Sequence, residues 1–334
     1  MSTTILSRRG FCSGALGAAG LMAAGGRAAA QAYPQRNFRV IIPTGQGGGA
    51  ERLARPFDDA WSKHLGKQFE YSFHPGAAGQ VGYELFVKRN PHDGHHLLFG
   101  NMGPEMIMYA VQKPDYRFPQ DFVYFSRMDI DDSVIFVKRD SPYQDIKAVV
   151  EAAKKKTLNV AVSRIPHPAS IGLLALGEAT GSQYNLIPYG GGNPTYIAML
   201  NGEADIGALP IAGVLALSDR LKVLGVFNRE NIFAAKTENA PTINSVFGTS
   251  IPDLYSSRAW AVHADWADAN PAHFERLQKT SEEAHRDPTF RDAFEKTGAP
   301  IEALKYGDRK TCTDYSLAMI ELSKRYEKVL SAQK

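Results

Sequence analysis

Residues 38–51 read FRVIIPTGQGGGAE, and the rest of the chain is organised around them. The apolar, β-branched run 38–42 predicts a short buried strand. A glycine-rich loop, 45–49, follows, and helical spacing of apolar residues begins at Ala50, although Pro56 is expected to kink that helix or delay its start. The first N–H groups of a helix lack partners, and the helix dipole is positive there. We therefore expect this loop to bind a carboxylate or a phosphate.

The beginning of the chain predicts export. Residues 1–32 contain a twin-arginine pattern, Ser7-Arg8-Arg9-Gly10-Phe11, then a weakly apolar run of about 15 residues that is too short to span a bilayer. Small residues at 28–32 suit cleavage. We expect a mature protein in the periplasm, exported by the twin-arginine route, or by the general secretory route if the arginine pair arose by chance.

Charge and cysteine content exclude several classes of protein. Three of the 38 Lys and Arg residues lie in the export segment, so the mature chain has 35 of them against 35 Asp and Glu. A near-neutral chain without a basic, aromatic-interleaved patch is not expected to bind nucleic acid. Beyond the export segment only Cys312 remains, so no intramolecular disulfide is expected.

A strand–loop–helix order recurs in two blocks of the mature chain, which predicts an α/β fold with mainly parallel sheets flanked by helices. In such sheets ligands bind outside the carboxyl ends of the strands. Two blocks indicate two lobes with a cleft between them. The glycine- or proline-rich loops that should face this cleft are 43–51, 75–80 and 100–104 in one block, and 163–170 and 189–194 in the other.

The order and spacing of several short motifs resemble the Bug family, the periplasmic substrate-binding proteins of tripartite tricarboxylate transporters. The motifs are Tyr33-Pro34, QGGGAE at 46–51, PGAAGQVG at 75–82, PHDG at 91–94, PYGGGNP at 188–194, LNGEAD at 200–205 and APT at 240–242. This chain departs from the family at Glu51, where Asp is usual, and at Leu209, where an Asp is frequent. It also lacks the usual glycines in the loop 163–170 and has Arg258 where an aromatic residue is common.

The resemblance implies a two-lobed periplasmic binding protein fold of type II, with lobe 1 formed by 33–137 and 256–334 and lobe 2 by 138–255. The chains are expected to cross between lobes near Lys138 and near Ser256. It further implies a monomeric protein that is not an enzyme, has no cofactor or metal, and delivers a small carboxylate to a two-component membrane permease. Apolar residues near the loops favour an aromatic or aliphatic mono- or dicarboxylate.

The predicted ligand site combines backbone N–H groups of lobe 1 with side chains of lobe 2. Arg164 could bind a carboxylate with two hydrogen bonds, as could Arg258, although each could equally be a surface residue or part of an interlobe salt bridge. The residues predicted to bind the ligand are Thr44, Gln46, Gly47, Gly48, Ala77, Ala78, Gly79, Asn101, Met102, Ser163, Arg164, His167, Ser170, Tyr189, Asn193 and Leu209.

Two other functions remain open. The glycine spacing of the loop 45–49 is similar to a dinucleotide-binding fingerprint, and Glu70 lies about 20 residues further on, where a ribose-binding acid would be expected. An exported dinucleotide-dependent enzyme is therefore one alternative. A binding protein that feeds a sensory receptor is the other. Histidines at 92, 95 and 96 around Asp93 are interpreted as a polar turn and not as a metal site, and Ser163 with His167 as hydrogen-bonding groups without a third catalytic partner.

Overall fold

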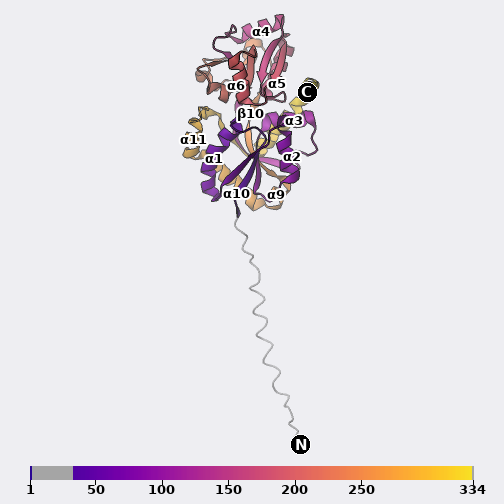
Figure 1. Cartoon of the computed structure of the whole chain (residues 1–334), viewed down its shortest axis with the longest axis vertical. Helices are drawn as coiled ribbons and strands as arrows, with labels where there is room; N and C mark the ends of the chain where they lie inside the picture. Colours follow the sequence, from indigo (N-terminus) through magenta and orange to yellow (C-terminus); the bar gives the residue numbers. More distant parts are fainter. Residues whose placement is uncertain (2–32, 333–334) are drawn as a thin grey trace. The chain divides into compact units, whose positions relative to one another are not determined.

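The computed structural model describes residue 1 and residues 33–332. It divides into a unit Met1–Gln35 and a unit Arg36–Lys334, and the helices and strands it describes all lie in the second unit. The predicted export signal, apart from residue 1, lies outside the described residues. Within the second unit, two sheets flanked by helices form two lobes (Figure 1), so the predicted α/β, two-lobed fold is confirmed. The prediction of mainly parallel sheets is wrong, because both sheets are mixed.

The sheet of lobe 1 has the strand order β12-β4-β11-β3-β1-β2. β1 pairs in parallel with both β2 and β3, as the repeated strand–loop–helix order predicts, whereas β11 and β12 pair antiparallel with their neighbours. The strands are β1 (Phe38–Ile42), β2 (Phe69–Phe73), β3 (His96–Asn101), β4 (Phe122–Asp129), β11 (Arg258–His263) and β12 (Leu304–Gly307).

The sheet of lobe 2 repeats this plan, with the order β10-β5-β8-β6-β7 and β9 paired to β5. β6 pairs in parallel with β7 and β8, and β5 runs antiparallel to β8, β9 and β10. The strands are β5 (Asp131–Lys138), β6 (Leu158–Val162), β7 (Tyr184–Pro188), β8 (Ile206–Pro210), β9 (Leu221–Val226) and β10 (Tyr255–Ser256).

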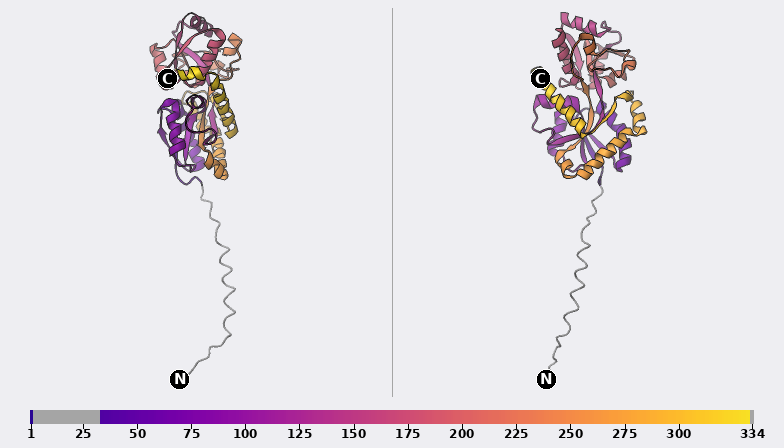
Figure 2. Two further views of the ribbon diagram at one scale, coloured as in Figure 1. Left: turned by 90° about the vertical axis from the view of Figure 1, so that its right-hand side faces the viewer. Right: turned by 180° about the vertical axis from the view of Figure 1, so that it is seen from behind.

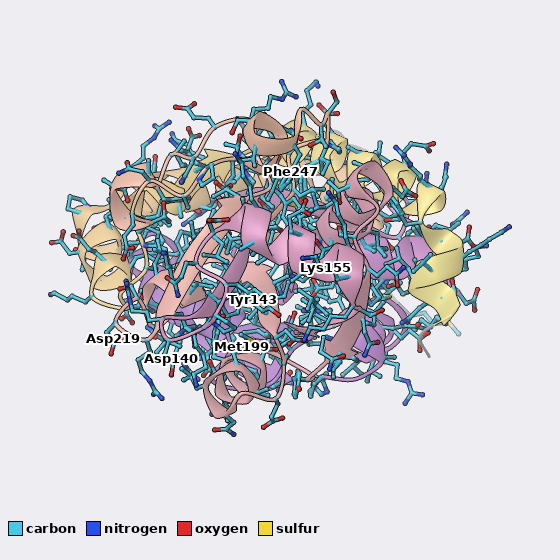
Figure 3. The ribbon with its side chains drawn as sticks, turned by 90° about the horizontal axis from the view of Figure 1, so that it is seen from above. Asp140, Tyr143, Lys155, Met199, Asp219 and Phe247 are labelled. Carbon is cyan, nitrogen blue, oxygen red and sulfur yellow. The ribbon has the colours of Figure 1, made fainter. Side chains whose placement is uncertain are left out.

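Helices cover both sheets, and each lobe has its own apolar core. Seen from the end of lobe 2, as in Figure 3, Lys155 marks the end of α4. The helices of lobe 1 are α1 (Gly49–Leu65), α2 (Gln80–Arg89), α3 (Met102–Gln112), α9 (Ala264–Ala269), α10 (Pro271–Arg286), α11 (Pro288–Glu295) and α12 (Arg309–Arg325). Those of lobe 2 are α4 (Ile146–Lys155), α5 (Pro168–Thr180), α6 (Gly192–Asn201), α7 (Ile211–Leu215) and α8 (Ile243–Phe247), and α13 (Glu327–Ala332) follows α12.

Helix α1 differs from the expectation, since it runs unbroken from Gly49 to Leu65 with Pro56 inside it. Proline in a helix interior costs about 3 kcal/mol, because a hydrogen bond is lost and the ring meets the preceding turn. The apolar face of α1 offsets this cost: Phe57 and Trp61 are fully buried, and their ring centroids lie 5.9 and 5.1 Å from that of Trp260 on β11.

The chain crosses between the sheets at Ile130 and again at Ser257. The first crossing lies eight residues before the expected position near Lys138, because 131–138 pairs with the second sheet and not with the first. No glycine or proline marks this crossing; the chain continues from β4 to β5 through Asp129-Ile130-Asp131 in extended form. A continuous strand that changes sheet has no local sequence signal, which is why the pattern placed the crossing late.

Candidate functional site

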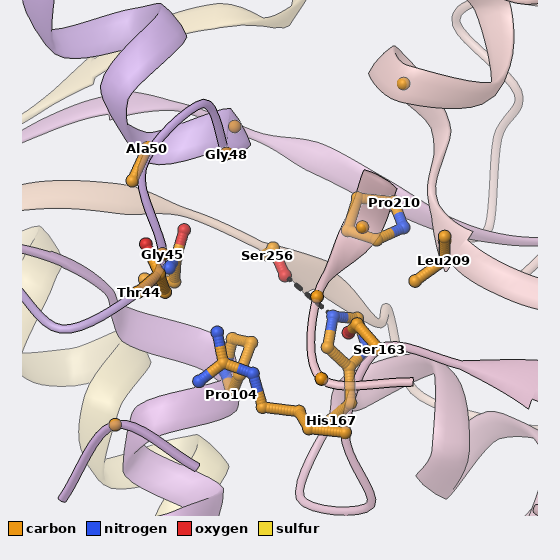
Figure 4. A pocket seen from close by; sticks show the side chains of 18 of the residues that line it. Thr44, Gly45, Gly48, Ala50, Pro104, Ser163, His167, Leu209, Pro210 and Ser256 are labelled. Atoms are coloured by element: carbon orange, nitrogen blue, oxygen red, sulfur yellow. Dashed lines mark hydrogen bonds between the residues drawn. The ribbon is translucent and has the colours of Figure 1, made fainter. Parts of the chain in front are cut away.

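Loops at the carboxyl ends of strands from both sheets meet around a cavity of about 650 Å³ between the lobes. Figure 4 shows Thr44, Gly45 and Gly48 on one side of it and Ser163, Leu209 and Pro210 on the other. The residues predicted to bind the ligand that line this cavity are Thr44, Gln46, Gly48, Ala77, Ala78, Gly79, Asn101, Ser163, Arg164, His167, Asn193 and Leu209.

Four residues predicted to bind the ligand do not line the cavity. Met102 is fully buried in the core of lobe 1. Ser170 is fully buried as well, and its hydroxyl donates to a backbone carbonyl of the preceding loop at 3.4 Å. Tyr189 packs against the core of lobe 2, and the N–H of Gly47 donates to a side-chain carboxylate of α1. A position next to a glycine loop identifies the strand end but not the direction in which each side chain points.

Five polar residues that the sequence analysis missed also line the cavity: Arg52, Gln112, Asp131, Ser256 and Thr297. Arg52 lies on the first turns of α1, whereas Asp131 and Ser256 are paired on the two crossing strands, β5 and β10. The acidic run at 129–132, placed between two apolar strands, was the available signal, because carboxylates seldom occur in buried strands without a partner.

The first turn of α1 leaves several donors for a ligand. Gly48, the N-cap residue, is extended and has no side chain to accept from the first turn. The carboxylate of Glu51 instead turns back to accept the N–H of Gly47 at 2.5 Å, and it pairs with Arg55 at 2.5 Å. The hydroxyl oxygen of Thr44 is buried and has no hydrogen-bond partner within residues 33–332.

The second loop, 76–79, is tightly folded beside the cavity. All four of its residues have positive φ angles, of 129°, 45°, 56° and 108°. Gly79 also permits a close approach, because a Cβ atom there would lie 3.2 Å from Cγ of Glu105 and 3.5 Å from Nη1 of Arg164. The backbone of this loop therefore reaches both the cavity and a charge pair behind it.

Two arginines connect the lobes across the cavity. Nη1 of Arg164, from lobe 2, donates to the carbonyl of Ala78 in lobe 1 at 2.8 Å and lies 3.4 Å from Oε1 of Glu105. Nη1 of Arg52, from lobe 1, donates to Oδ1 of Asn193 in lobe 2 at 3.3 Å. These two hydrogen bonds join the lobes directly across the cavity.

Arg258 on β11 bridges the end of β4 and the start of β5. One of its terminal nitrogens pairs with Asp129 at the end of β4, and the other pairs with Asp131 at the start of β5 at 2.8 Å. Both carboxylates are 1% exposed. Of the three roles weighed for Arg258, the structure shows the interlobe salt bridge. Arg258 also lines the cavity, with both of its terminal nitrogens already paired to carboxylates.

His167 is a neutral side chain at the floor of the cavity. Its Nδ1 accepts the backbone N–H of Ala169 at 3.1 Å, which places the ring proton on Nε2, 3.5 Å from Oγ of Ser256 (Figure 4). Burial, with the charges of Arg164 and Arg258 acting in the same direction, lowers the pKa of His167 to about 3. Since both ring nitrogens have other partners and neither contacts a carboxylate, no Ser-His-Asp arrangement is formed around this ring.

Metal-ligand clusters and membrane-spanning helices are both absent from the part of the chain that the structure describes. No group of three or more His, Cys, Asp or Glu side chains there could hold a metal ion. The histidines of the turn around Asp93 make ordinary contacts: Nδ1 of His96 lies 3.0 Å from Asp93, and Nδ1 of His92 lies 2.7 Å from Asp265. Across residues 33–332 no helix is both long enough and apolar enough to cross a membrane.

Comparison with known proteins identifies relatives over most of the chain. The family model described as "Tripartite tricarboxylate transporter family receptor" matches residues 53–313. The protein BugT of Bordetella pertussis is 23% identical over 276 residues, which cover 81% of this chain and 82% of BugT. A UPF0065 protein of Pseudomonas sp. strain P51 is 26% identical over 199 residues, which cover 58% of this chain and only 59% of that relative.

A solved structure shares the fold. MatC from Rhodopseudomonas palustris, solved with bound malate, superposes with a TM-score of 0.74 at 19% sequence identity, over 89% of this chain and all of MatC. At this identity the likeness establishes the fold, and it agrees with two lobes built on mixed sheets.

Proposed function

The chain belongs to the tripartite tricarboxylate transporter receptor family, whose members are solute-binding proteins, and from this premise we propose that it captures a small carboxylate in the periplasm. The ligand is an aromatic or aliphatic mono- or dicarboxylate, enclosed in the cavity between the lobes. The protein then delivers it, as a monomer, to a two-component membrane permease. Its role is capture without chemical conversion.

The observation that carries this proposal is a set of hydrogen-bond donors at the cavity that have no partner within residues 33–332. The first-turn N–H groups of α1 meet the buried, unpartnered hydroxyl of Thr44 at the cavity wall, within residues 33–332. A carboxylate has several lone pairs to accept from such donors. Neutral amides also stabilise an anion without the desolvation of a buried cation, so they suit a ligand that must be released again.

The apolar part of the wall suits the carbon skeleton of such a ligand. Leu209 and Pro210 from lobe 2 face Pro104 from lobe 1 across the cavity (Figure 4). Ligand pockets in proteins combine a mostly apolar lining with a few placed polar groups. MatC, with the same fold, was solved with malate, a dicarboxylate, which supports the same class for this chain.

A specific contact argues against the dinucleotide alternative. The carboxylate of Glu51 already accepts the N–H of Gly47 in the glycine-rich loop. A pyrophosphate bound by the backbone of that loop would have to compete with Glu51 for the N–H of Gly47, and the carboxylate would repel it. The sensory alternative uses the same capture step, and it differs in the partner that recognises the closed protein.

A thermal-shift screen tests the proposed function. The purified protein is heated with malate, adipate, benzoate, an amino acid mixture and NAD, each in separate samples. A ligand present at a hundred times its dissociation constant adds about 2.7 kcal/mol of stability, which raises the melting temperature by several degrees. Shifts with one or more carboxylates are expected. A shift with NAD and none with any carboxylate would contradict the proposal.

A variant of the loop tests where the carboxylate binds. Gly48→Val is expected to weaken carboxylate binding at least tenfold, measured by calorimetry, because the side chain would stand where the ligand approaches the first-turn amides. Gly48 has a φ of −74°, which valine can adopt, and its Cβ would lie 3.1 Å from the carbonyl oxygen of Gly45, so only a small shift is needed. Gly48→Ala should lose less. Unchanged affinity in the valine variant, with an unchanged melting temperature, would place the carboxylate elsewhere.

A further inference from the structure

The contact between Glu105 and Arg164 joins the lobes away from the strand crossings. Glu105 lies on α3 of lobe 1, and Arg164 lies on the loop that follows β6 in lobe 2. Their side chains are 3.4 Å apart, and the side chain of Glu105 is 0% exposed. Arg164 also donates to the carbonyl of Ala78, so the guanidinium is held by two groups of the opposite lobe.

The surroundings of Glu105 belong almost entirely to lobe 1. Its carboxylate accepts from the hydroxyl of Tyr83 at 2.8 Å, from Nδ2 of Asn101 at 3.2 Å, and from the backbone N–H of Asn101. Tyr124 lies next to Tyr83, with the two hydroxyls in contact. These donors are neutral. Burial raises the pKa of Glu105, and the positive charge of Arg164 acts in the opposite direction.

We propose that Glu105 is a positioning residue for Arg164 and that the two form a latch that stabilises the closed cleft. The carboxylate is fixed in the core of lobe 1, and the guanidinium arrives with lobe 2, so the pair exists only when the lobes meet. The ligand part of this inference rests on the proposed function, whereas the closure part does not.

Opening the cleft affects the two partners differently. Arg164 lies on a loop at the cavity, so it regains water when the lobes separate. Glu105 keeps its hydrogen bonds with Tyr83 and Asn101 of lobe 1, but it loses the Arg164 cation beside it. Removing one partner of a buried pair is unfavourable for the partner that remains, so the closed arrangement is favoured by the fixed carboxylate.

The latch leaves part of Arg164 available to a ligand. Its contacts within residues 33–332 use Nη1, while Nε and Nη2 make no hydrogen bond there. Arg164 lines the cavity, so a second ligand carboxylate could bind these two nitrogens as a bidentate pair. Glu105 does not line the cavity, so it affects the ligand only through the position of Arg164 and through closure.

The closure part is tested by a distance between the lobes in ligand-free protein. Spin labels are placed at Lys279→Cys on α10 and Lys155→Cys on α4, two exposed positions, the second of which is seen in Figure 3. The background carries Cys12→Ser, and Cys312 is buried. Pulsed electron resonance then compares the wild type with Glu105→Gln, which keeps the shape and removes the charge.

A longer or broader distance distribution is expected in Glu105→Gln, and ligand at saturation is expected to restore the wild-type distance. Arg164→Gln should lengthen the ligand-free distance in the same way. The matched control is Asp58→Asn, a buried acid of lobe 1 on α1 that has no partner in lobe 2, and its distribution should equal that of the wild type. Distributions for Glu105→Gln and Arg164→Gln that equal the wild type would overturn the latch.

The ligand part is tested by calorimetry with matched mono- and dicarboxylates, such as hexanoate and adipate. Glu105→Gln should weaken hexanoate three- to tenfold, because closure is less favourable without the carboxylate. It should weaken adipate somewhat more, because Arg164 is then less well positioned for the second ligand carboxylate. Arg164→Gln should weaken adipate more than hexanoate, because a direct contact is lost as well. If no carboxylate binds the wild type, the proposed function fails while the distance measurement still decides the latch. A loss confined to adipate in Glu105→Gln, with hexanoate binding unchanged, would contradict the role of Glu105 in closure.

Discussion

Arg258 and three acidic residues are almost inaccessible to solvent where the strands cross between the lobes. Asp129, Asp131 and Asp132 are each 1% exposed, and one guanidinium faces them. Burial raises the pKa of Asp129 to about 6, with Asp131 adding to the rise and Arg258 opposing it. Asp132 is not paired with the guanidinium; burial and the charge of Asp131 raise its pKa to about 7, against a smaller effect of Asn228. At this crossing, acids outnumber the cation that stabilises them.

Asp132→Asn is therefore expected to stabilise the protein at pH 8 by about 4 kcal/mol, measured by urea denaturation. The pKa of Asp132 is higher in the folded state, so the folded state holds a proton that the unfolded state releases between pH 4 and pH 7. The carboxyl thus destabilises the fold increasingly as pH rises through this range. The gain should shrink as pH falls towards 4, and Asp219→Asn, at an exposed position, should change little at either pH. A gain independent of pH would refute this account.

At the scale of single elements, helix α1 combines two local conflicts. It begins directly after the glycine loop without a side-chain cap, and it includes Pro56. Both features would weaken an isolated helix. They persist because Leu53, Phe57 and Trp61 bury an apolar face against the sheet of lobe 1, while the uncapped first turn keeps its donors for a ligand. The element is held by its packing and is left open at the end that faces the cavity.

Replacing the proline should show this balance. Pro56→Ala is expected to raise the free energy of unfolding by about 2 kcal/mol, because the helix regains a hydrogen bond to the carbonyl of Arg52 while the unfolded chain gains some freedom. Pro271→Ala is the matched control, since Pro271 occupies the first turn of α10, where proline is favourable. Urea denaturation of both variants decides the point; equal effects would mean that Pro56 does not strain α1.

At the scale of the whole second unit, the end of the chain makes a further connection between the lobes. Helix α12 packs on α3 and β4 of lobe 1, and Tyr326 and Leu330, at and beyond its end, join the apolar core of lobe 2. Figure 2 shows this last helical segment in yellow beside the junction of the lobes. Arg325 adds an ion pair to Glu178 on α5 at 3.0 Å. Packing, and not only the two strand crossings, therefore links the lobes.

Leu330→Ala should consequently lower the free energy of unfolding by about 2–4 kcal/mol, because a buried leucine side chain is replaced by a cavity. Leu330 is 3% exposed, whereas its neighbour Val329 is 42% exposed, so Val329→Ala is the control and should change stability by less than about 0.5 kcal/mol. Chemical denaturation of both variants provides the comparison. A negligible effect of Leu330→Ala would show that α13 contributes no packing between the lobes.

The sequence by itself determined the strand–loop–helix order, the glycine loops at 45–49 and 76–79, and the family resemblance. These follow from residues that are neighbours along the chain: apolar periodicity sets the strands and helices, and glycine sets the turns. It also predicted much of the cavity wall, because the carboxyl ends of parallel strands meet at one edge. The prediction of which residues bind the ligand awaits the binding experiments.

Only the tertiary structure decided which side chains face the cavity and how charges are paired. Met102 and Ser170 lie within the predicted loops 100–104 and 163–170, yet both belong to helices and are buried in the core. Arg52 and Asp131 line the cavity although no binding motif includes them. Arg164 and Glu105 are 59 residues apart and meet only when the lobes close. Such contacts depend on the rotation of each helix and the approach of the two sheets. Local sequence patterns cannot specify them, because the energy that selects them comes from burial between distant segments.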